Sequence, residues 1–264
     1  MYWYDGQLIE QDQICLPLTE PGLIYGATVF TTLRVYQQSL EHPLTQWEAH
    51  CHRLEHSLKD FAWTLPSWPQ LRQGAKCLIP HYPVLRLTIF PDGREWIMGR
   101  FLPEDLAASQ RQGIRAWVAN HSLFQRTLNA YKTGNYLGPW LALQKAQSLG
   151  FREAILVNSQ GNWLESSTGN LWGYKAGKWY TPSLEDGILP GIGRSQLISW
   201  LSNQKIEINE SQWTLEWVKE LEIIAYTNSV VEIIPFSQIV LGEKQLVFDV
   251  SHRGLQQLKN YYQL

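Results

Sequence analysis

The sequence has few cysteines, no long apolar run and no cluster of basic residues, and each of these absences excludes a class of protein. Its 264 residues include three cysteines, an odd number without the spacing of a metal site, and we expect them to be buried packing residues. No stretch approaches the roughly 20 apolar residues that a membrane span needs. The N-terminus lacks the basic start and apolar core of a signal peptide. We therefore expect a protein of the reducing cytoplasm without a membrane partner.

The charge balance excludes a second class. The formal net charge is −2, and no Lys/Arg-rich segment offers the basic surface that nucleic-acid binding needs. His50 and His52 would face different sides of a helix, so we predict no metal site there. The glycine loops that cradle phosphates and the GxSxG nucleophile motif are also absent. Small anionic ligands are not excluded, because a few arginines suffice to bind them.

Segments typical of strands and of helices follow one another without a regular βαβ rhythm. Hydrophobic residues make up 44% of the chain, which suits one large domain or two modest ones. Alternating patterns predict strands at residues 2–8 (a hairpin around Asp5-Gly6), 29–36, 84–90, 114–118, 153–158 and 222–227. Helices are predicted after Thr45 and near residues 137–148, 194–201 and 252–262. This mixture favours an α+β fold.

One helix has a clear predicted start, and one segment reads as a linker. Thr45 and Glu48 have the spacing of a capping box. The apolar stripe that follows is Trp47, Cys51, Leu54, Leu58 and Phe61. Residues 104–112, by contrast, are polar and have no apolar period. We therefore predict a smaller N-terminal domain of residues 1–103, a linker of residues 104–112 and a larger C-terminal domain of residues 113–264.

Six segments carry the chemistry, and none of them is specific by itself. They are residues 25–35 (YGATVFTTLRV), 50–54 (HCHRL), 131–135 (YKTGN), 164–172 (LESSTGNLW), 189–194 (LPGIGR) and 228–235 (NSVVEIIP). Together and in this order they resemble the fold type IV pyridoxal-phosphate enzymes, the branched-chain-aminotransferase-like family. The resemblance covers essentially the whole chain. It implies the two-domain architecture of D-amino-acid aminotransferases, pyridoxal 5'-phosphate as cofactor, and a homodimer.

The resemblance also implies roles for single residues. Lys132 would carry the cofactor as a Schiff base and act as the catalytic base, which requires a lowered pKa so that the neutral amine is available. Glu165 would pair with the pyridine nitrogen and keep it protonated. Arg53 would bind the cofactor phosphate with its planar fork. Without the surrounding motifs, each of the three would be an ordinary surface side chain.

The phosphate would also lie on a helix N-terminus that begins at Ile192 and Gly193. The family's usual threonine in this turn is Gly193 here, so only backbone donors remain at that position. Ser229 could supply a hydroxyl in compensation. Asn228, the residue before it, completes the predicted cofactor-binding set.

Three features favour the 4-amino-4-deoxychorismate lyases of this family over its transaminases. Thr31 stands after Phe30, where transaminases usually place a glutamate; Asn228 stands where they tend to have threonine; and Asn135 follows Lys132 by three residues. The alternatives are an aminotransferase for D- or branched-chain amino acids and, less favoured, a non-catalytic relative that binds the cofactor.

The lyase substrate is a small dicarboxylate, so cationic side chains should line its site. Arg86, Arg94, Arg100 and Arg126 are the candidates, and the sequence does not rank them. Tyr25, Thr28 and Phe30 belong to the early strand that lines the site in the family. After the strand at 84–90, relatives commonly carry Arg-Gly and a longer loop, whereas this chain has the short Pro91–Arg94. Substrate recognition therefore stays open.

Overall fold

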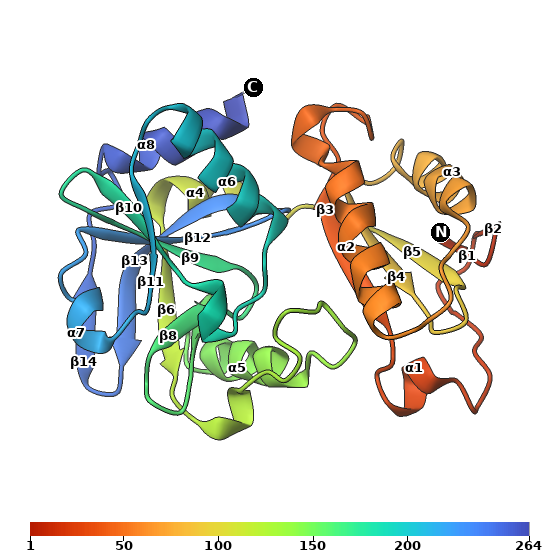
Figure 1. The fold of residues 1–264 in the computed structure, drawn as a ribbon, viewed down its shortest axis with the longest axis horizontal. Helices are drawn as coiled ribbons and strands as arrows, with labels where there is room; N and C mark the ends of the chain where they lie inside the picture. The colour runs from red at the N-terminus through yellow and green to blue at the C-terminus, as the bar shows by residue number, and fades with distance from the viewer. Residues whose placement is uncertain (264) are drawn as a thin grey trace. The chain divides into compact units, whose positions relative to one another are not determined.

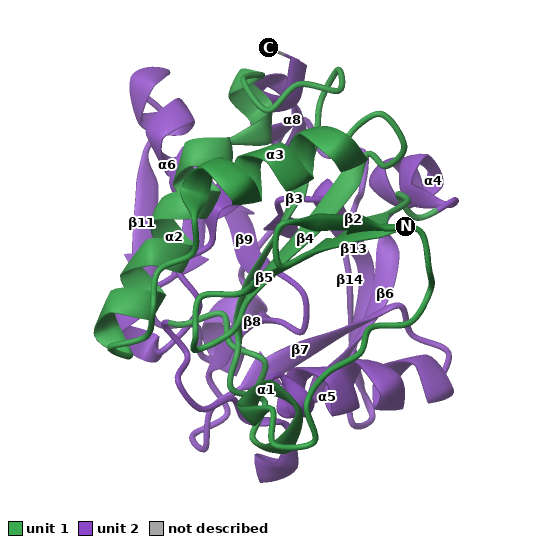
Figure 2. Ribbon diagram, turned by 90° about the vertical axis from the view of Figure 1, so that its right-hand side faces the viewer, with its two compact units in different colours: residues 1–103, 131–135 green, residues 104–130, 136–264 purple. Residues whose placement is uncertain are grey.

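The computed structural model describes residues 1–263, and these form two compact units, which Figure 2 distinguishes by colour. Unit 1 contains residues 1–103 and 131–135, and unit 2 contains residues 104–130 and those from 136 onward. This division differs from the predicted one in two places. Residues 104–112 belong to unit 2, and seven of them form a helix, α4 (Leu106–Gln112), which lacks an apolar period because it buries only Leu106 and Ser109. Lys132 belongs to unit 1 rather than to the C-terminal domain.

Unit 1 is an antiparallel five-stranded sheet covered by two helices. The strand order is β2-β1-β5-β4-β3. Its strands are β1 (Tyr2–Tyr4), β2 (Gln7–Ile9), β3 (Val29–Arg34), β4 (Val84–Ile89) and β5 (Glu95–Arg100). Its helices are α1 (Pro21–Ile24), η1 (Pro43–Thr45), α2 (Trp47–Asp60) and α3 (Trp68–Leu78). Helix α2 lies against β3, and α3 lies against β1 and β5 (Figure 1).

The apolar stripe of α2 packs as predicted, but the helix begins differently. Trp47, Cys51, Leu54 and Leu58 are buried in the core of unit 1, and Phe61 packs against it. The N-cap is Gln46, whose φ of 54° lies in the left-handed region and which makes no side-chain cap. The Thr45 hydroxyl instead donates to the Ser39 carbonyl and accepts from the Tyr36 N–H. The predicted capping box is therefore wrong, because the preceding turn takes the threonine hydroxyl.

Unit 2 is built on a sheet that closes on itself. The strand order is β11-β10-β9-β12-β13-β6-β7-β8, and β8 also pairs with β9, so that six strands form a ring. Its strands are β6 (Ile114–Ala119), β7 (Glu153–Val157), β8 (Trp163–Ser166), β9 (Asn170–Lys175), β10 (Lys178–Pro182), β11 (Ile208–Ser211), β12 (Ile223–Asn228), β13 (Glu232–Leu241) and β14 (Lys244–Val247). A single residue pair, Glu165 with Asn170, joins β8 to β9. The ring therefore closes at a predicted site residue.

Short helices surround this ring. Besides α4, they are η2 (Ser122–Phe124), α5 (Leu137–Ser148), η3 (Leu184–Asp186), α6 (Ile192–Asn203), α7 (Leu215–Val218), α8 (Gly254–Lys259) and η4 (Asn260–Gln263). Helix α5 packs on β7, and α6 packs on β12 and β11. Across residues 1–263, no helix is both long enough and apolar enough to span a bilayer.

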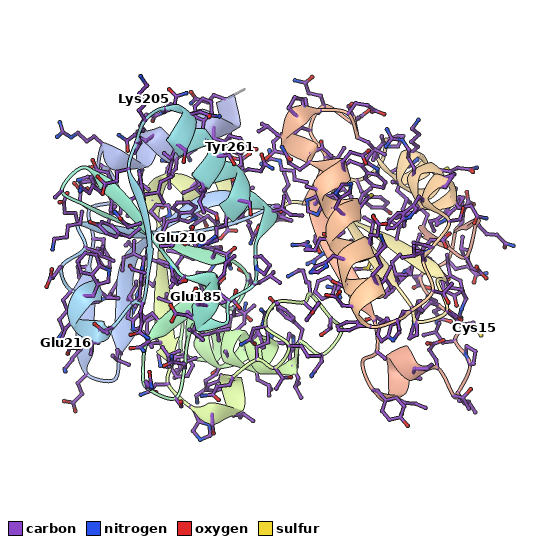
Figure 3. The ribbon with its side chains drawn as sticks, viewed as in Figure 1. Cys15, Glu185, Lys205, Glu210, Glu216 and Tyr261 are labelled. Carbon is purple, nitrogen blue, oxygen red and sulfur yellow. The ribbon has the colours of Figure 1, made fainter. Side chains whose placement is uncertain are left out.

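The cysteines differ from one another in exposure. Cys51 is buried and Cys77 is half-buried, as expected for packing residues. Cys15 is exposed (Figure 3), so the expectation of burial is wrong for this residue, which precedes α1 in an irregular segment. Within residues 1–263, no group of three or more His, Cys, Asp or Glu side chains is placed to hold a metal ion.

Candidate active site

The lysine segment is held by backbone hydrogen bonds to the edge strand of unit 1. The Phe30 N–H donates to the Lys132 carbonyl over 2.8 Å, and the Gly134 N–H donates to the Thr28 carbonyl over 2.8 Å. A side chain on Gly134 would collide with the Gly26 carbonyl and the Thr28 hydroxyl, each 2.5 Å from the position of its Cβ. Because an edge strand offers unpaired backbone groups, residues 131–135 extend the sheet and fix the backbone of Lys132.

The Phe30 ring brings Lys132 and Arg86 together. The Lys132 Nζ lies 4.8 Å from the ring centroid, and the Arg86 Cζ lies 3.5 Å from the same centroid. Arg86 projects from β4, next to the strand that carries Phe30. The structure thus gathers three of the predicted residues, and it separates Arg86 from the other candidate arginines.

Arg53 belongs to a second cluster in unit 1. Its Nη2 donates to the Thr31 hydroxyl. The same Thr31 oxygen lies 2.5 Å from the His50 Nδ1. Thr31 is 0% exposed and His50 is 1% exposed, so both hydrogen bonds are shielded from water. Burial lowers the pKa of His50 well below its usual value, and the positive charges of Arg53 and Lys132 lower it further.

Arg94 and Arg100, two of the other candidate arginines, have different surroundings from Arg86. Arg94 donates from Nε to Asp92 and from its two Nη atoms to Tyr4 and the buried Glu20. All three of its guanidinium nitrogens are therefore engaged in unit 1, and one of the partners, Asp92, lies in the short turn of residues 91–94. Arg100, at the end of β5, is exposed. Tyr25 is also exposed, with 77% of its surface accessible.

In unit 2, Arg126 forms a buried ion pair with Glu165. Their nearest atoms, Nη2 and Oε1, are 3.2 Å apart, and their side chains are 4% and 7% exposed. Arg126 Nη2 also donates to the Asn129 carbonyl. Tyr136 lies beneath the guanidinium, with 5.5 Å between Cζ and the ring centroid. Burial, with the Glu165 charge next in size, raises the pKa of Tyr136 to about 12, although Arg126 opposes the shift.

Glu165 and Asn170 hold the turn that leads into α6. The Leu189 N–H donates to Glu165 Oε2 over 3.1 Å, and Asn170 Nδ2 donates to the Leu189 carbonyl over 2.9 Å. The two residues face each other where β8 meets β9. Gly191, the N-cap of α6, leaves room for this contact, because its Cβ would lie 2.0 Å from Asn170 Oδ1. This geometry accounts for the spacing of glutamate and asparagine in the motif.

The predicted phosphate turn comes together in the same unit. Ile192 and Gly193 open α6, whose N-cap residue makes no side-chain cap. The position of a Cβ on Gly193 lies 3.7 Å from the Asn228 carbonyl carbon, so the α6 N-terminus and the end of β12 are adjacent. Asn228 Oδ1 accepts from the N–H groups of Val230 and Val231. Its side chain therefore shapes the turn that carries the half-buried Ser229.

Glu153 is a buried carboxylate behind the loop that joins β8 and β9. It accepts from the Ser167 and Thr168 hydroxyls and from the Ala154 N–H. Burial raises the pKa of Glu153, although these hydrogen bonds lower it in part. Since the raised pKa favours the protonated form in the folded state, the folded state loses stability as the pH rises above 4.5, the ordinary value, through the folded pKa.

We expect Glu153→Gln to become more stable relative to the parent protein as the pH increases. The amide keeps the shape of the side chain but cannot ionise. The melting temperature of the variant minus that of the parent protein should therefore be a few degrees higher at pH 8 than at pH 5. Thermal unfolding at both pH values measures this. The exposed Glu216 (Figure 3) provides the control as Glu216→Gln. An equal difference at both pH values would contradict the burial argument.

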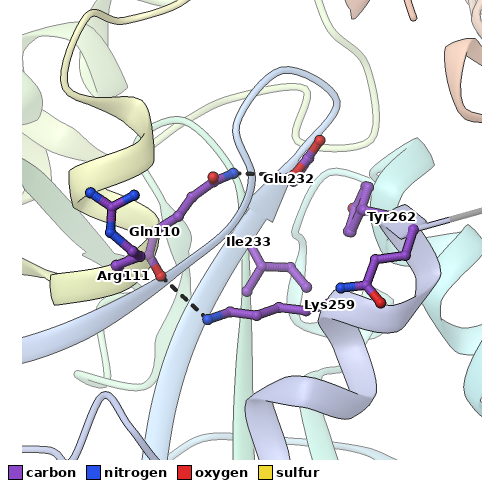
Figure 4. Close-up of a pocket in the computed structure, with 7 residues that line it drawn as sticks. Gln110, Arg111, Glu232, Ile233, Lys259 and Tyr262 are labelled. Carbon is purple, nitrogen blue, oxygen red and sulfur yellow. Dashed lines mark hydrogen bonds between the residues drawn. The ribbon is translucent and has the colours of Figure 1, made fainter.

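The sequence did not single out Tyr136 or the role of Asn170, and it placed His50 in the motif of residues 50–54 without a role of its own. Most residues around a cavity of about 260 Å³ in unit 2, beside the turn after Asn228, also lie outside the six motif segments; Glu232 and Ile233 belong to residues 228–235. Gln110 Nε2 donates there to Glu232, and Lys259 Nζ donates to the Gln110 carbonyl (Figure 4). Gln110 and Lys259 stand far apart in the sequence, and no local motif marks them.

Comparison with known proteins identifies the family. A family model described as amino-transferase class IV matches residues 28–239. The chain belongs to this family. The predicted family is therefore confirmed.

Two relatives named for different activities resemble the chain over most of its length. It is 24% identical over 266 residues to an aminodeoxychorismate lyase of Vibrio harveyi, covering 95% of each chain. It is 23% identical over 261 residues to a branched-chain-amino-acid aminotransferase of Pseudomonas aeruginosa, covering 90% of this chain and 84% of the relative.

A solved structure shares the fold. It is described as a hypothetical aminotransferase from Mycobacterium tuberculosis in its PLP-bound form. Its TM-score is 0.83 at 17% identity, with 99% of this chain and 98% of that chain covered. The predicted α+β fold of the type IV architecture is confirmed.

Proposed function

We propose that this protein uses pyridoxal 5'-phosphate to convert 4-amino-4-deoxychorismate to 4-aminobenzoate and pyruvate. The observation that carries the proposal is the Phe30 ring, which holds Lys132 and Arg86 on one side chain. The same aromatic ring therefore contacts an amine that can act as nucleophile and base and a cation suited to a substrate carboxylate.

The residues present fit this cofactor. Arg126 has two buried N–H groups, at Nε and Nη1, that find no acceptor among residues 1–263, which suits a site that receives a polar ligand. The N-terminus of α6 offers backbone N–H groups without a side-chain cap. We propose that the cofactor is bound by Lys132, Arg53, Glu165, Ile192, Gly193, Ser229 and the backbone of Asn228.

In the proposed reaction, Lys132 moves the proton, and Glu165 and Arg53 hold the cofactor. When bound, pyridoxal phosphate supplies an electron-withdrawing ring that accepts the electron pair left by proton removal. Lys132 takes the proton from the substrate carbon that bears the amino group, the bond to the enolpyruvyl oxygen breaks, and Lys132 returns the proton to the leaving enolpyruvate. Glu165 keeps a positive charge at the ring nitrogen, and Arg53 holds the phosphate. The amino group stays on the product, so no second substrate is needed.

The choice of lyase over transaminase rests on sequence. Thr31 stands where transaminases of the family usually have glutamate, and the similarity to the V. harveyi lyase spans 95% of both chains. The similarity to the P. aeruginosa aminotransferase makes a transaminase the second candidate. Lys132 and Glu165 would serve either reaction.

A direct assay separates the two. Purified protein loaded with the cofactor is incubated with 4-amino-4-deoxychorismate, and 4-aminobenzoate and pyruvate are followed together. Equimolar release over many turnovers without a keto acid supports the lyase. If the protein instead converts an amino acid and a keto acid and leaves the lyase substrate intact, the lyase proposal is wrong.

Arg86→Gln should weaken substrate binding more than turnover. The guanidinium would pair with a substrate carboxylate equally in the ground state and the transition state, so KM should rise roughly 10-fold or more, with kcat changed much less. Arg94→Gln is the matched control. It should leave KM unchanged but destabilise the fold by roughly 2–4 kcal/mol, because it leaves the buried Glu20 without its partner. A KM effect in the Arg94 variant alone would reverse the two assignments.

We also propose that the protein is a homodimer. Leu18, Leu23, Ile24 and Tyr25 around α1 are between 52% and 91% exposed, an apolar surface that a second copy would cover. Sedimentation should give twice the chain mass of 30.6 kDa. Leu23→Ser combined with Ile24→Ser should shift the protein toward monomer, whereas Leu149→Ser, at an exposed leucine of unit 2, should not. Sedimentation of the parent protein as a monomer would refute the proposal.

A further inference from the structure

We infer that Thr31 and His50 are positioning residues that hold the Arg53 guanidinium in the orientation needed for the cofactor phosphate. The inference rests on the proposed role of Arg53 as a phosphate ligand. It adds to that proposal a role for two buried residues that do not themselves touch the cofactor.

The three side chains form a short chain of hydrogen bonds inside unit 1. Thr31 comes from β3, and His50 and Arg53 come from α2, which lies against that strand. His50 and Arg53 are three residues apart and so share one side of the helix. Thr31 lies between them, with its hydroxyl 2.5 Å from His50 Nδ1 and in hydrogen-bond contact with Arg53 Nη2.

The chemistry of the groups fixes the direction of one bond. A guanidinium has N–H donors and no acceptor, so Thr31 must accept from Arg53. The Thr31 hydroxyl has a second lone pair and one proton, so it donates to or accepts from His50 Nδ1 according to the imidazole tautomer. The lowered pKa of His50 favours the neutral imidazole, so Arg53 is the charged member of the three in either tautomer.

This arrangement orients Arg53 before a ligand arrives. Arginine has a long, flexible side chain, and fixing it in advance reduces the entropy lost when an anion binds. One bond to Thr31 uses one of the five N–H groups of a guanidinium, and a bidentate contact to a phosphate uses two more. Because Thr31 is 0% exposed, water does not compete for its hydroxyl.

The competing explanation is that Thr31 and His50 only satisfy each other in the core. The two explanations predict different effects on folding stability and on ligand affinity. A core role would alter folding stability and would affect all ligands equally. A positioning role acts through the phosphate contact, so it should affect pyridoxal 5'-phosphate and leave pyridoxal, which lacks the phosphate, unaffected.

The experiment compares the affinities of the cofactor-free full-length protein for pyridoxal 5'-phosphate and for pyridoxal, measured by the absorbance of the lysine-bound aldehyde. Thr31→Val keeps the shape of the side chain and removes the hydroxyl. We expect it to weaken phosphate-ester binding roughly 10-fold, the size of one hydrogen bond to a charged group, with pyridoxal unchanged. Thr31→Ser should restore the parent affinity, and His50→Leu should weaken binding in the same selective way.

The matched control is Thr88→Val. Thr88 is 3% exposed on the neighbouring strand β4, opposite Phe30, and its hydroxyl contacts no acceptor among residues 1–263. This variant makes the same chemical change in the same sheet and should leave both affinities unchanged. Circular dichroism and thermal unfolding establish that each variant is folded.

Arg53→Met separates this inference from the proposed role of Arg53. It should weaken phosphate-ester binding selectively, and adding Thr31→Val to it should cause no further loss. If Arg53→Met is selective but Thr31→Val is not, the positioning role is wrong and the proposed role of Arg53 stands. If Arg53→Met itself affects both ligands equally, the phosphate assignment and the inference both fail.

Discussion

Lys132→Ala is expected to abolish turnover and the absorbance of the bound cofactor together. The lysine would serve as attachment point, base and acid, and removing one well-placed acid–base group alone costs up to about 10,000-fold. The backbone of residues 131–135 pairs with β3 through main-chain atoms, so the variant should keep the fold and melting behaviour of the parent protein. Absorbance spectra and product release over time measure both effects.

An exposed lysine provides the control for this experiment. Lys145→Ala, in the last turn of α5, should behave like the parent protein in both assays. Turnover that survives in the Lys132 variant would move the catalytic role to another residue. Loss of turnover with an unchanged cofactor spectrum would mean that Lys132 acts as a base without binding the cofactor.

Glu165→Gln is expected to reduce turnover roughly 100-fold or more while the protein still binds the cofactor. The amide can still accept from the Leu189 N–H, which keeps the turn before α6 in place. It cannot hold a positive charge at the cofactor ring nitrogen, and electrostatic contributions of this kind are worth about 100- to 1,000-fold in kcat. The variant also leaves Arg126 buried without its carboxylate, so we expect a loss of roughly 3 kcal/mol in the free energy of unfolding.

Glu95→Gln tests whether any buried carboxylate would give the same result. Glu95 is 3% exposed and accepts from Trp3 Nε1 and the Gly6 N–H in unit 1. Its replacement should leave kcat unchanged. If kcat falls equally in both variants, the effect of Glu165→Gln reflects a general loss of structure, and the proposed role at the ring nitrogen is unsupported.

Much of the fold follows from the sequence because local patterns were strong. The hairpin at Asp5-Gly6, the strand at Val29 and helix α5 lie where the periodicity predicts them. Strand β13 was not predicted, although it is paired on both sides within the ring, with β12 and β6 as neighbours. Pro235 within it cannot donate a backbone hydrogen bond, and proline usually argues against a central strand. The strand nevertheless continues past it, and its register against β6 shifts between Phe236 and Gln238.

The site could be predicted only in part, because some of its contacts form between residues that no local sequence pattern links. Lys132, Arg53 and Glu165 stand in motifs that a single sequence displays, so they could be named. The pairing of Arg126 with Glu165 depends on how a loop lies over a closed ring of strands, and no local spacing encodes that contact. Arg126 was therefore grouped with the substrate arginines. The sequence alone likewise could not show that Arg94 is engaged by Glu20.

The backbone pairing of residues 131–135 with β3 bears on how this protein can be dissected or recombined. The chain passes between the units after residues 103, 130 and 135, so no single cut separates them. A fragment of residues 1–103 would contain the whole five-stranded sheet, yet it would leave the Phe30 N–H and the Thr28 carbonyl without partners on an exposed edge. Bare edges of this kind promote association between chains. Expression of that fragment should therefore give aggregates, and swapping N-terminal units between relatives should succeed only when the lysine segment is exchanged with them.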